Sequence, residues 1–267
     1  MARRELEFGP ERLAADLDAL GVAAGSTVLV HCSMSAVGRV AGGPEALLGA
    51  LLSILGTEGT LVVPAQTAGN SNTSPRYLAA TAGLSPDEAA AFETTIPGFD
   101  PATSPVEGMG SLAERVRRQP GAVRSGHPQT SFAALGPRAA ALTAVHDLDC
   151  HLGERSPLGA LYAADAKILL LGVGYAVCTA FHLAEYRLPK PPELRPHRCY
   201  VRQDTGRIQL DFLAPHLDDS DFSRLGLEVE RTGFVRTGLI GAAPSRLLPM
   251  PPAVDLAVEW MIGHRQR

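Results

Sequence analysis

The chain has no hydrophobic run long enough to cross a membrane. Its longest apolar stretches, such as Ile168 to Leu171, are far shorter than the ~20 residues that a spanning helix needs. The first residues include Arg3 and Arg4 but no apolar core of signal-peptide length. The sequence therefore predicts a cytoplasmic protein that does not associate with membranes.

Cysteine is scarce and irregularly spaced. The chain has four cysteines, which are Cys32, Cys150, Cys178 and Cys199. Because they show no short paired spacing, we expect free thiols in a reducing compartment. Cys150 beside His151, and His197 near Cys199, lack the repeated ligand spacing of a structural zinc site. We therefore expect no metal.

Neither sign of charge is in large excess. The 24 basic and 28 acidic residues leave a net charge of −4 at pH 7. This balance provides no excess of basic residues for binding nucleic acid, and it mildly favours a cationic partner. The chain is rich in hydrophobic residues, which make up 45% of its 267 residues. No obvious linker divides the sequence. We expect a single domain over residues 1–267 with a large core.

Helical and strand patterns alternate along the N-terminal half. Helices are expected over 11–20, 44–55, 111–118 and 138–145, and strands over 27–31, 60–64 and 167–171. This order predicts an α/β fold with a mostly parallel central sheet flanked by helices in three layers. Between the strand at 60–64 and the helix at 111–118, residues 66–110 form a long polar segment with a helix near 86–92. We interpret this segment as one wall of the substrate-binding site.

The C-terminal part follows a different pattern. Residues 197–212 and 234–243 are expected to be short antiparallel strands on either side of a helix near 219–232. This pattern predicts a small antiparallel β extension near the C-terminus. Trp260 lies in an apolar stretch that we interpret as a packed terminal helix.

The stretch from Lys167 to Glu185 carries the clearest chemical signal. A buried apolar strand runs into a glycine turn and then a short helix, which places His182 and Glu185 on one helical face. In open α/β sheets, ligands bind just beyond the carboxyl ends of the strands. A carboxylate three residues after a histidine can fix its tautomer, so the pair suits proton removal from a nucleophile. A satisfied structural pair is the alternative, because the H-x-x-E spacing is common.

A second strand, loop and helix unit begins near His31. The loop from Cys32 to Gly38 has free backbone amides and the small hydroxyls of Ser33 and Ser35, which suit phosphate binding. A simple polar turn would look the same. His31 could contact an acyl carbonyl or bond only to backbone.

Six motifs in fixed order resemble one family. They are H-C-S-M-S at 31–35, F-D-P-A-T-S-P at 99–105, G-M-G-S-L-A-E at 108–114, R-S-G-H-P at 124–128, L-L-L-G-V at 169–173 and T-A-F-H-L-A-E at 179–185. This set is similar to that of the aminoglycoside 3-N-acetyltransferases. The resemblance implies acetyl transfer from acetyl coenzyme A (acetyl-CoA), the co-substrate, to the 3-amino group of the 2-deoxystreptamine ring of an aminoglycoside, giving antibiotic resistance.

The resemblance also implies roles for individual residues. His182 would be the general base and Glu185 its orienting partner. The coenzyme cleft would be lined by His31, Ser33, Met34, Ser35, Ala36, Val37, Thr103, Ser125 and Ser131. The aminoglycoside, or a related cationic small molecule, would contact Gln66, Glu93, Asp100 and Thr179. Asp100 also precedes Pro101 and is compatible with a simple turn.

The chain departs from the family pattern at three places. Cys32 stands where a serine is common and Cys178 where an asparagine is common. Either thiol could accept the acetyl group, although direct attack by the amine needs only a base and a bound thioester. Residues 65–74 carry no acid, whereas many relatives place acids there, so the sequence does not identify the amine.

The favoured mechanism is a direct sequential transfer, with donors near Ser35 or Thr179 stabilising the oxyanion. Two alternatives remain: an acyltransferase of secondary metabolism that acts on a non-antibiotic amine, and a non-catalytic module that binds coenzyme A or a nucleotide. The presence of both His182 and Glu185 favours catalysis. The acyl chain length and the oligomeric state stay open, with a homodimer among the options.

Overall fold

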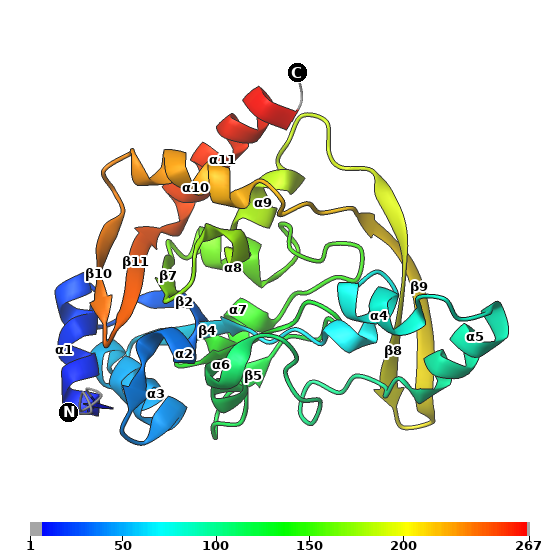
Figure 1. The fold of residues 1–267 in the computed structure, drawn as a ribbon, viewed down its shortest axis with the longest axis horizontal. Coiled ribbons are helices and arrows are strands. Elements are labelled where there is room, and N and C mark those ends of the chain that lie inside the picture. The colour runs from blue at the N-terminus through cyan, green and yellow to red at the C-terminus, as the bar shows by residue number, and fades with distance from the viewer. Residues whose placement is uncertain (1–6, 266–267) are drawn as a thin grey trace, which may run out of the picture.

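The computed structural model describes residues 7–265 (Figure 1). Its centre is a seven-stranded sheet in the order β10-β11-β7-β2-β4-β6-β5. The strands are β2 (Thr27–Cys32), β4 (Thr60–Pro64), β5 (Val123–Arg124), β6 (Phe132–Leu135), β7 (Lys167–Leu171), β10 (Arg236–Ile240) and β11 (Ala243–Pro249). The pairings β7-β2 and β2-β4 are parallel, and the other four are antiparallel. The parallel strands therefore form the centre of a mixed sheet.

Helices cover both faces of this sheet. One face carries α1 (Pro10–Leu20), α3 (Gly43–Leu55) and α6 (Gly110–Arg117). The other carries α7 (Ala139–Thr143), α8 (Pro157–Ala163), α9 (Phe181–Tyr186), α10 (Phe222–Glu230) and α11 (Met250–Arg265). Because successive strand side chains point to opposite faces, Ile168 and Leu170 of β7 enter one hydrophobic cluster while Leu169 and Leu171 enter the other. The expected α/β class with three layers is confirmed.

A long hairpin stands beside the main sheet. It consists of β8 (Leu194–Gln203) and β9 (Gly206–Pro215), and α4 (Pro75–Thr81) and α5 (Pro86–Thr95) lie next to it at the right of Figure 1. The hairpin confirms the small antiparallel extension. Residues 234–243 were wrongly expected to share it, because β10 pairs with β11, and β11 continues the central sheet through β7.

The long segment after β4 contains more helix than its sequence suggested. A helix near residues 86–92 was expected, and α5 extends it to Thr95 behind a capping box of Ser85 and Glu88. The helix α4 was missed, although Ser74 caps it and Pro75 begins it. Both helices have no fully buried residue, so the apolar periodicity that signals a packed helix is weak there.

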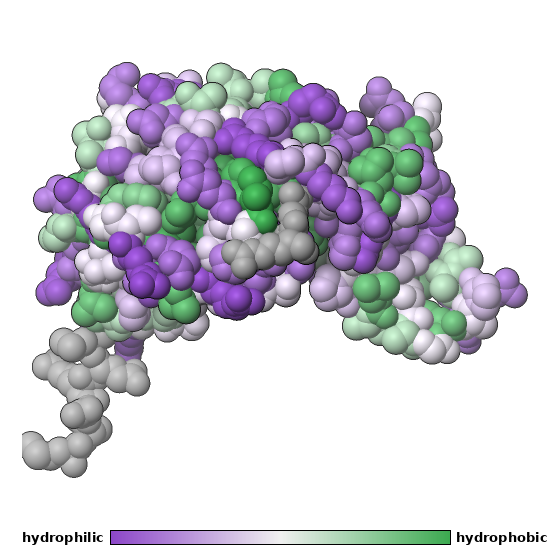
Figure 2. Space-filling model, turned by 90° about the horizontal axis from the view of Figure 1, so that it is seen from above, coloured by the Kyte–Doolittle hydropathy of each residue, from purple (hydrophilic) through white to green (hydrophobic). Residues whose placement is uncertain are grey.

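The remaining elements are short. They are β1 (Glu7–Phe8), α2 (Met34–Val37), β3 (Arg39–Val40), and the 3₁₀ turns η1 (Ala68–Asn70) and η2 (Tyr175–Val177). Hydrophobic residues on the surface form small patches separated by hydrophilic ones (Figure 2). Within residues 7–265, no helix combines the length and apolar character needed to cross a membrane.

A cluster of three buried histidines and the half-buried His146 joins the hairpin to the main body. The rings of His127 and His146 lie 4.7 Å apart, those of His127 and His151 4.9 Å, and those of His151 and His197 4.5 Å. His127 accepts the backbone N–H groups of Gln129 and Thr130 through Nδ1 and so holds its own loop in place. Burial lowers the pKa of His146 to about 4 and that of His151 to about 3. We conclude that the cluster is neutral near pH 7.

This cluster predicts acid sensitivity of folding. The folded-state pKa values lie below the ordinary value of 6.5, so the unfolded chain binds more protons between about pH 6.5 and 4. Stability should therefore be complete above pH 6.5 and fall as the pH decreases, by about 1.4 kcal/mol per pH unit for each such histidine. Urea unfolding at several pH values measures the slope. His146→Gln should reduce it, whereas His216→Gln, at an exposed histidine directly after β9, should not.

Candidate active site

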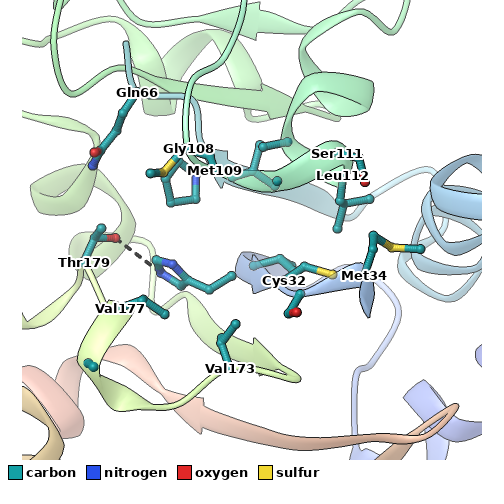
Figure 3. Close-up of a pocket in the computed structure, with 18 of the residues that line it drawn as sticks. Cys32, Met34, Gln66, Gly108, Met109, Ser111, Leu112, Val173, Val177 and Thr179 are labelled. Atoms are coloured by element: carbon teal, nitrogen blue, oxygen red, sulfur yellow. Dashed lines mark hydrogen bonds between the residues drawn. The ribbon is translucent and has the colours of Figure 1, made fainter. Parts of the chain in front are cut away.

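A cavity of about 540 Å³ opens at the carboxyl ends of β2, β4 and β7 (Figure 3). Figure 3 shows Cys32 and Met34 on one side, Gln66 and Thr179 on another, and Met109 facing Val173 across the space. Its size is within the range of roughly 300–1,000 Å³ typical of small-molecule sites. The position is the one where α/β sheets bind ligands.

Backbone geometry brings two loops together under this cavity. Gly172 follows β7 with a φ of +67°, and a Cβ there would lie 2.6 Å from Cβ of Ala36 in α2. Glycine alone permits both the left-handed conformation and the close approach. The loop after β2 and the loop after β7 can therefore share one wall.

His182 and Glu185 form a close pair on α9. Nδ1 of His182 lies 2.6 Å from Oε2 of Glu185, and His182 lines the cavity. The carboxylate is an acceptor only, so Nδ1 carries the proton and Nε2 keeps its lone pair. Phe222 packs against the imidazole with ring centroids 4.8 Å apart. The pair is therefore arranged as a general base held by a carboxylate.

Glu185 is itself held by two further groups. Its side chain is only 1% exposed, and Oε1 accepts from Nη1 of Arg265 at 2.7 Å and from the Asp218 backbone N–H at 2.9 Å. Arg265 also pairs with Asp221 and donates to the Asp218 carbonyl. Both carboxylate oxygens are thus used, which keeps a buried charge satisfied and the imidazole in one orientation.

His31 and Thr179 meet at the other side of the cavity. Nε2 of His31 lies 3.3 Å from Oγ1 of Thr179, the dashed contact in Figure 3. Burial lowers the pKa of His31 to about 4, so this imidazole is neutral at pH 7. Hydroxyls of Ser33 and Ser35 lie 3.0 Å apart nearby. These neutral donors suit a polar group that gains charge during a reaction.

The cysteines at the site are poor nucleophiles. Burial raises the pKa of both Cys32 and Cys178 to about 12. Cys32 lines the cavity, whereas Cys178 is fully buried and lies outside its lining. Because the thiolate is the reactive form, neither thiol is activated here.

The cavity collects part of the residues expected to form the site. Those that line it are His31, Ser33, Met34, Ser35, Gln66, Thr179 and His182. Those that do not line it are Ala36, Val37, Glu93, Asp100, Thr103, Ser125 and Ser131. Glu185 stands behind His182 and contacts it directly. The cavity thus brings together the loops after β2 and β7, whereas the expected residues between positions 93 and 131 do not line it.

The two carboxylates expected to hold the substrate have structural partners. Glu93 accepts hydrogen bonds from the hydroxyls of Tyr77 and Tyr200 and pairs with Arg198. Asp100 accepts from the Ala102 backbone N–H and the Thr103 hydroxyl. Glu93 therefore ties α5 to the hairpin, and Asp100 stabilises a turn, as its position before Pro101 also allowed.

Ser125 and Ser131 belong to the scaffold behind the cavity. Ser125 contacts Nδ1 of His146 at 2.9 Å, and Ser131 donates to the Ala65 carbonyl at 2.8 Å. Arg124, which precedes Ser125, donates to Ser131, to the Ala65 and Ser104 carbonyls and to Thr67. Through these hydrogen bonds, the R-S-x-H-P motif connects the segment after β4 to the segment before β6. Val37 is buried in the core with Ala36 packed beside it.

Sequence reasoning missed several functional positions. Residues 108–113, at the start of α6, form a complete wall of the cavity, and the glycines of G-M-G were the available signal. Asp219 and Phe222 complete the lining near His182. Arg265 had no signal, because its partner Glu185 is 80 residues away. Within residues 7–265, no group of three or more His, Cys, Asp or Glu side chains is arranged to hold a metal ion.

The fold and the site together define an α/β protein with a histidine held by a carboxylate at the edge of its sheet. Residues 29–262 match the sequence model of the aminoglycoside 3-N-acetyltransferase family. The chain belongs to this family.

Individual relatives agree with this result. Aminoglycoside N(3)-acetyltransferase VII of Streptomyces paromomycinus is 39% identical over 94% of this chain and 90% of that protein. Aminoglycoside N(3)-acetyltransferase III of Pseudomonas aeruginosa is 33% identical over 91% and 89%. The crystal structure of YokD from Bacillus subtilis superposes with a TM-score of 0.92 at 32% identity, covering 98% and 96% of the two chains. That of AAC-IIIb with CoASH gives 0.84 at 33% identity, covering 97% of each.

Proposed function

We propose that this protein transfers the acetyl group of acetyl-CoA to an amine of an aminoglycoside, the 3-amino group of the 2-deoxystreptamine ring. The observation that carries the proposal is the 2.6 Å contact of His182 with Glu185 at the edge of the 540 Å³ cavity. The family relatives support it, since solved structures contain AAC-IIIb with CoASH and a mutant of AAC(3)-IVa with apramycin. Acetylation of the drug would give resistance.

The cavity fits the thioester end of acetyl-CoA. Apolar side chains of Met34, Val173 and Val177 suit the thin pantetheine arm, and the hydroxyls of Ser33 and Ser35 offer donors and acceptors to its amides. Gly110 has a φ of +82°, and a Cβ there would lie 3.3 Å from the Cys32 carbonyl. The glycine keeps the cavity open between these walls.

His182 acts as the general base in the proposed mechanism. Its Nε2 takes a proton from the substrate amine as the amine nitrogen attacks the thioester carbonyl, while Glu185 stabilises the resulting imidazolium. The Thr179 hydroxyl, or a donor near Ser35, stabilises the oxyanion. When the carbon–sulfur bond breaks, His182 returns the proton to the departing thiolate. The products are the N-acetyl amine and coenzyme A.

The test is a substrate panel analysed by mass spectrometry. The protein is incubated with acetyl-CoA and a series of aminoglycosides that do or do not carry a free 3-amino group. We expect a mass gain of one acetyl group only where that amine is free, together with thiol release. Absence of acetylation across the panel, with coenzyme binding retained, would reject the aminoglycoside as substrate.

The cysteine variants test whether the transfer is direct. Cys32→Ser and Cys178→Ser, singly or together, should keep activity within a few-fold, because both thiols have a pKa of about 12 and neither is activated. Initial rates of thiol release and intact-protein mass after acid quench measure this. An acetylated cysteine that disappears together with activity in the matching variant would establish a covalent intermediate.

A second candidate is an acyltransferase acting on a non-antibiotic amine. The observation favouring it is that only one carboxylate, Asp219, lines the cavity with His182 among the described residues. A polycationic drug would be expected to meet several acids. The panel above, extended to simple amino sugars, distinguishes the two candidates.

Three further expectations belong to the same proposal. We treat residues 1–267 as one domain, which the family match over 29–262 supports. The cytoplasm is the proposed location, because it supplies acetyl-CoA. A homodimer is compatible with the proposed mechanism and is checked by light scattering.

A further inference from the structure

A second histidine faces the cavity from the end of β2. His31 is 7% exposed and lines the cavity together with Thr179 and His182. Its Nε2 lies 3.3 Å from Oγ1 of Thr179, and neither side chain makes another hydrogen bond within residues 7–265. Unlike His182, it has no carboxylate partner in the described part of the chain. His31 is therefore not arranged as a base.

The imidazole of His31 is neutral at pH 7, because burial lowers its pKa to about 4. A neutral imidazole has one N–H group and one nitrogen with a lone pair, so its contact with a hydroxyl can run in either direction. In the first arrangement, Nε2–H donates to Oγ1 of Thr179 and leaves the hydroxyl proton for another acceptor. In the second, the hydroxyl donates to Nε2 and has no proton to offer to a molecule in the cavity.

Thr179 has a fixed position relative to the proposed base. It lies three residues before His182, and its carbonyl accepts the His182 backbone N–H at 3.1 Å. Its hydroxyl points to the His31 imidazole in the middle of Figure 3. The hydroxyls of Ser33 and Ser35 differ from it, because they contact each other at 3.0 Å and are exposed. Of these three hydroxyls, that of Thr179 lies on the same turn of backbone as the base.

The chemistry of the thioester selects the first arrangement. A carbonyl oxygen accepts hydrogen bonds but cannot donate them. It gains negative charge when the amine nitrogen attacks the carbonyl carbon and the π-electron pair moves onto the oxygen. With Nε2–H of His31 donating to Oγ1 of Thr179, the hydroxyl can donate to this oxygen, and each hydrogen bond polarises the next. The electron pair returns to carbon as the carbon–sulfur bond breaks, and Thr179 keeps its proton throughout.

We propose that His31 is a positioning residue that holds the Thr179 hydroxyl as the oxyanion donor, with Nε2–H donating to Oγ1 and the hydroxyl donating to the thioester carbonyl. This inference rests on the proposed acetyl transfer. Thr179 contacts the reacting group, and His31 acts through Thr179. A neutral imidazole supplies the N–H group without placing a positive charge in the cavity that contains His182, where a cation would oppose protonation of the base.

Two amide variants of His31 separate the hydrogen bond from the bulk of the side chain. The amide nitrogen of glutamine reaches about as far as histidine Nε2, whereas that of asparagine is one methylene shorter. His31→Gln should keep kcat within about threefold of wild type, and the matched control His31→Asn should lower it about 10- to 100-fold. The KM for acetyl-CoA should change little in both, because the hydrogen bond strengthens in the transition state. Stabilisation by coenzyme A checks that each variant is folded.

Thr179 variants test whether His31 acts through the hydroxyl. Thr179→Val should lower kcat about 100- to 1,000-fold, as expected for loss of an oxyanion donor, and Thr179→Ser should recover most of it. Adding His31→Asn to Thr179→Val should cost little more, because no hydroxyl remains to be positioned. Losses that add in the double variant would contradict the proposal.

An NMR measurement tests the hydrogen bond without any acceptor. The probe is acetylcarba(dethia)-CoA, an unreactive ketone in which a methylene group replaces the thioester sulfur, isotope-labelled at the carbonyl carbon. Bound to wild type or His31→Gln, its carbonyl signal should lie downfield of that of the free probe, as expected for an accepted hydrogen bond. Thr179→Val and His31→Asn should lose most of this shift. A purely structural role of His31 would leave the shift unchanged in every variant that binds the probe.

The tautomer of His31 is measured on the same complex. Nitrogen NMR of histidine-labelled protein should show the proton on Nε2, and a proton on Nδ1 would overturn the inference. An unshifted carbonyl signal in wild type, or failure of the probe to bind, would also overturn it. If the signal is shifted but no amine is acetylated, the arrangement stands and the proposed acetyl transfer fails. If amines are acetylated equally well by His31→Asn, the transfer stands and the inference is rejected.

Discussion

His182→Ala is expected to lower kcat about 100- to 10,000-fold while coenzyme A still raises the thermal stability of the protein. Nε2 of His182 is free, and its Nδ1 is held by the buried carboxylate of Glu185. Among the described residues, no other side chain that lines the cavity has this arrangement, so we expect no neighbour to replace His182 as the base. Loss of a general base typically has this magnitude. The cavity walls at residues 33–35 and 108–113, where we propose that the coenzyme binds, are untouched by the substitution.

Thiol release and a thermal melt with coenzyme A measure both parts of this prediction. Added imidazole should restore some activity to His182→Ala by entering the space left beside Glu185. A folded His182→Ala protein with near wild-type turnover would show that another group removes the proton. Loss of the coenzyme-induced stabilisation would show instead that the variant has lost its binding site.

Glu185→Gln and Arg265→Gln are both expected to impair the function of His182, but in different ways. Glu185→Gln removes the acceptor that orients Nδ1 of His182, and we expect kcat to fall by about 100-fold or more with little change in the KM for acetyl-CoA. Arg265→Gln leaves the 1% exposed carboxylate of Glu185 without its cation. Breaking a buried pair in this way destabilises by about 3 kcal/mol.

Urea unfolding and kinetics on both variants test the connection. Arg265→Lys should recover part of the stability, because an ammonium can still pair with Glu185. In the double variant the two effects should not add, since each residue acts through the other. Additive losses would show that Arg265 supports only the end of α11 and does not position the base.

The sequence by itself determined the repeated strand-loop-helix units and the His182–Glu185 pair. Both depend on local rules: apolar strands, a glycine turn, and side chains three residues apart on one helical face. These rules placed β2, β4, β7 and α3 within a residue or two of their observed bounds. The family resemblance followed from the same local motifs, and the match over residues 29–262 confirmed it.

The tertiary structure decided everything that joins distant parts of the chain. Residues 236–240 form an edge strand of the central sheet, because they pair with β11 and β11 pairs with β7. The alternation of polar and apolar residues along a strand does not specify which strand it pairs with. Glu93 and Asp100 look like free acids in a polar loop, but packing gives Glu93 two tyrosines and an arginine, and gives Asp100 a local turn. Arg265 reaches Glu185 across 80 residues for the same reason. Side-chain partners of this kind are set by how the layers pack, and one-dimensional spacing carries no information about them.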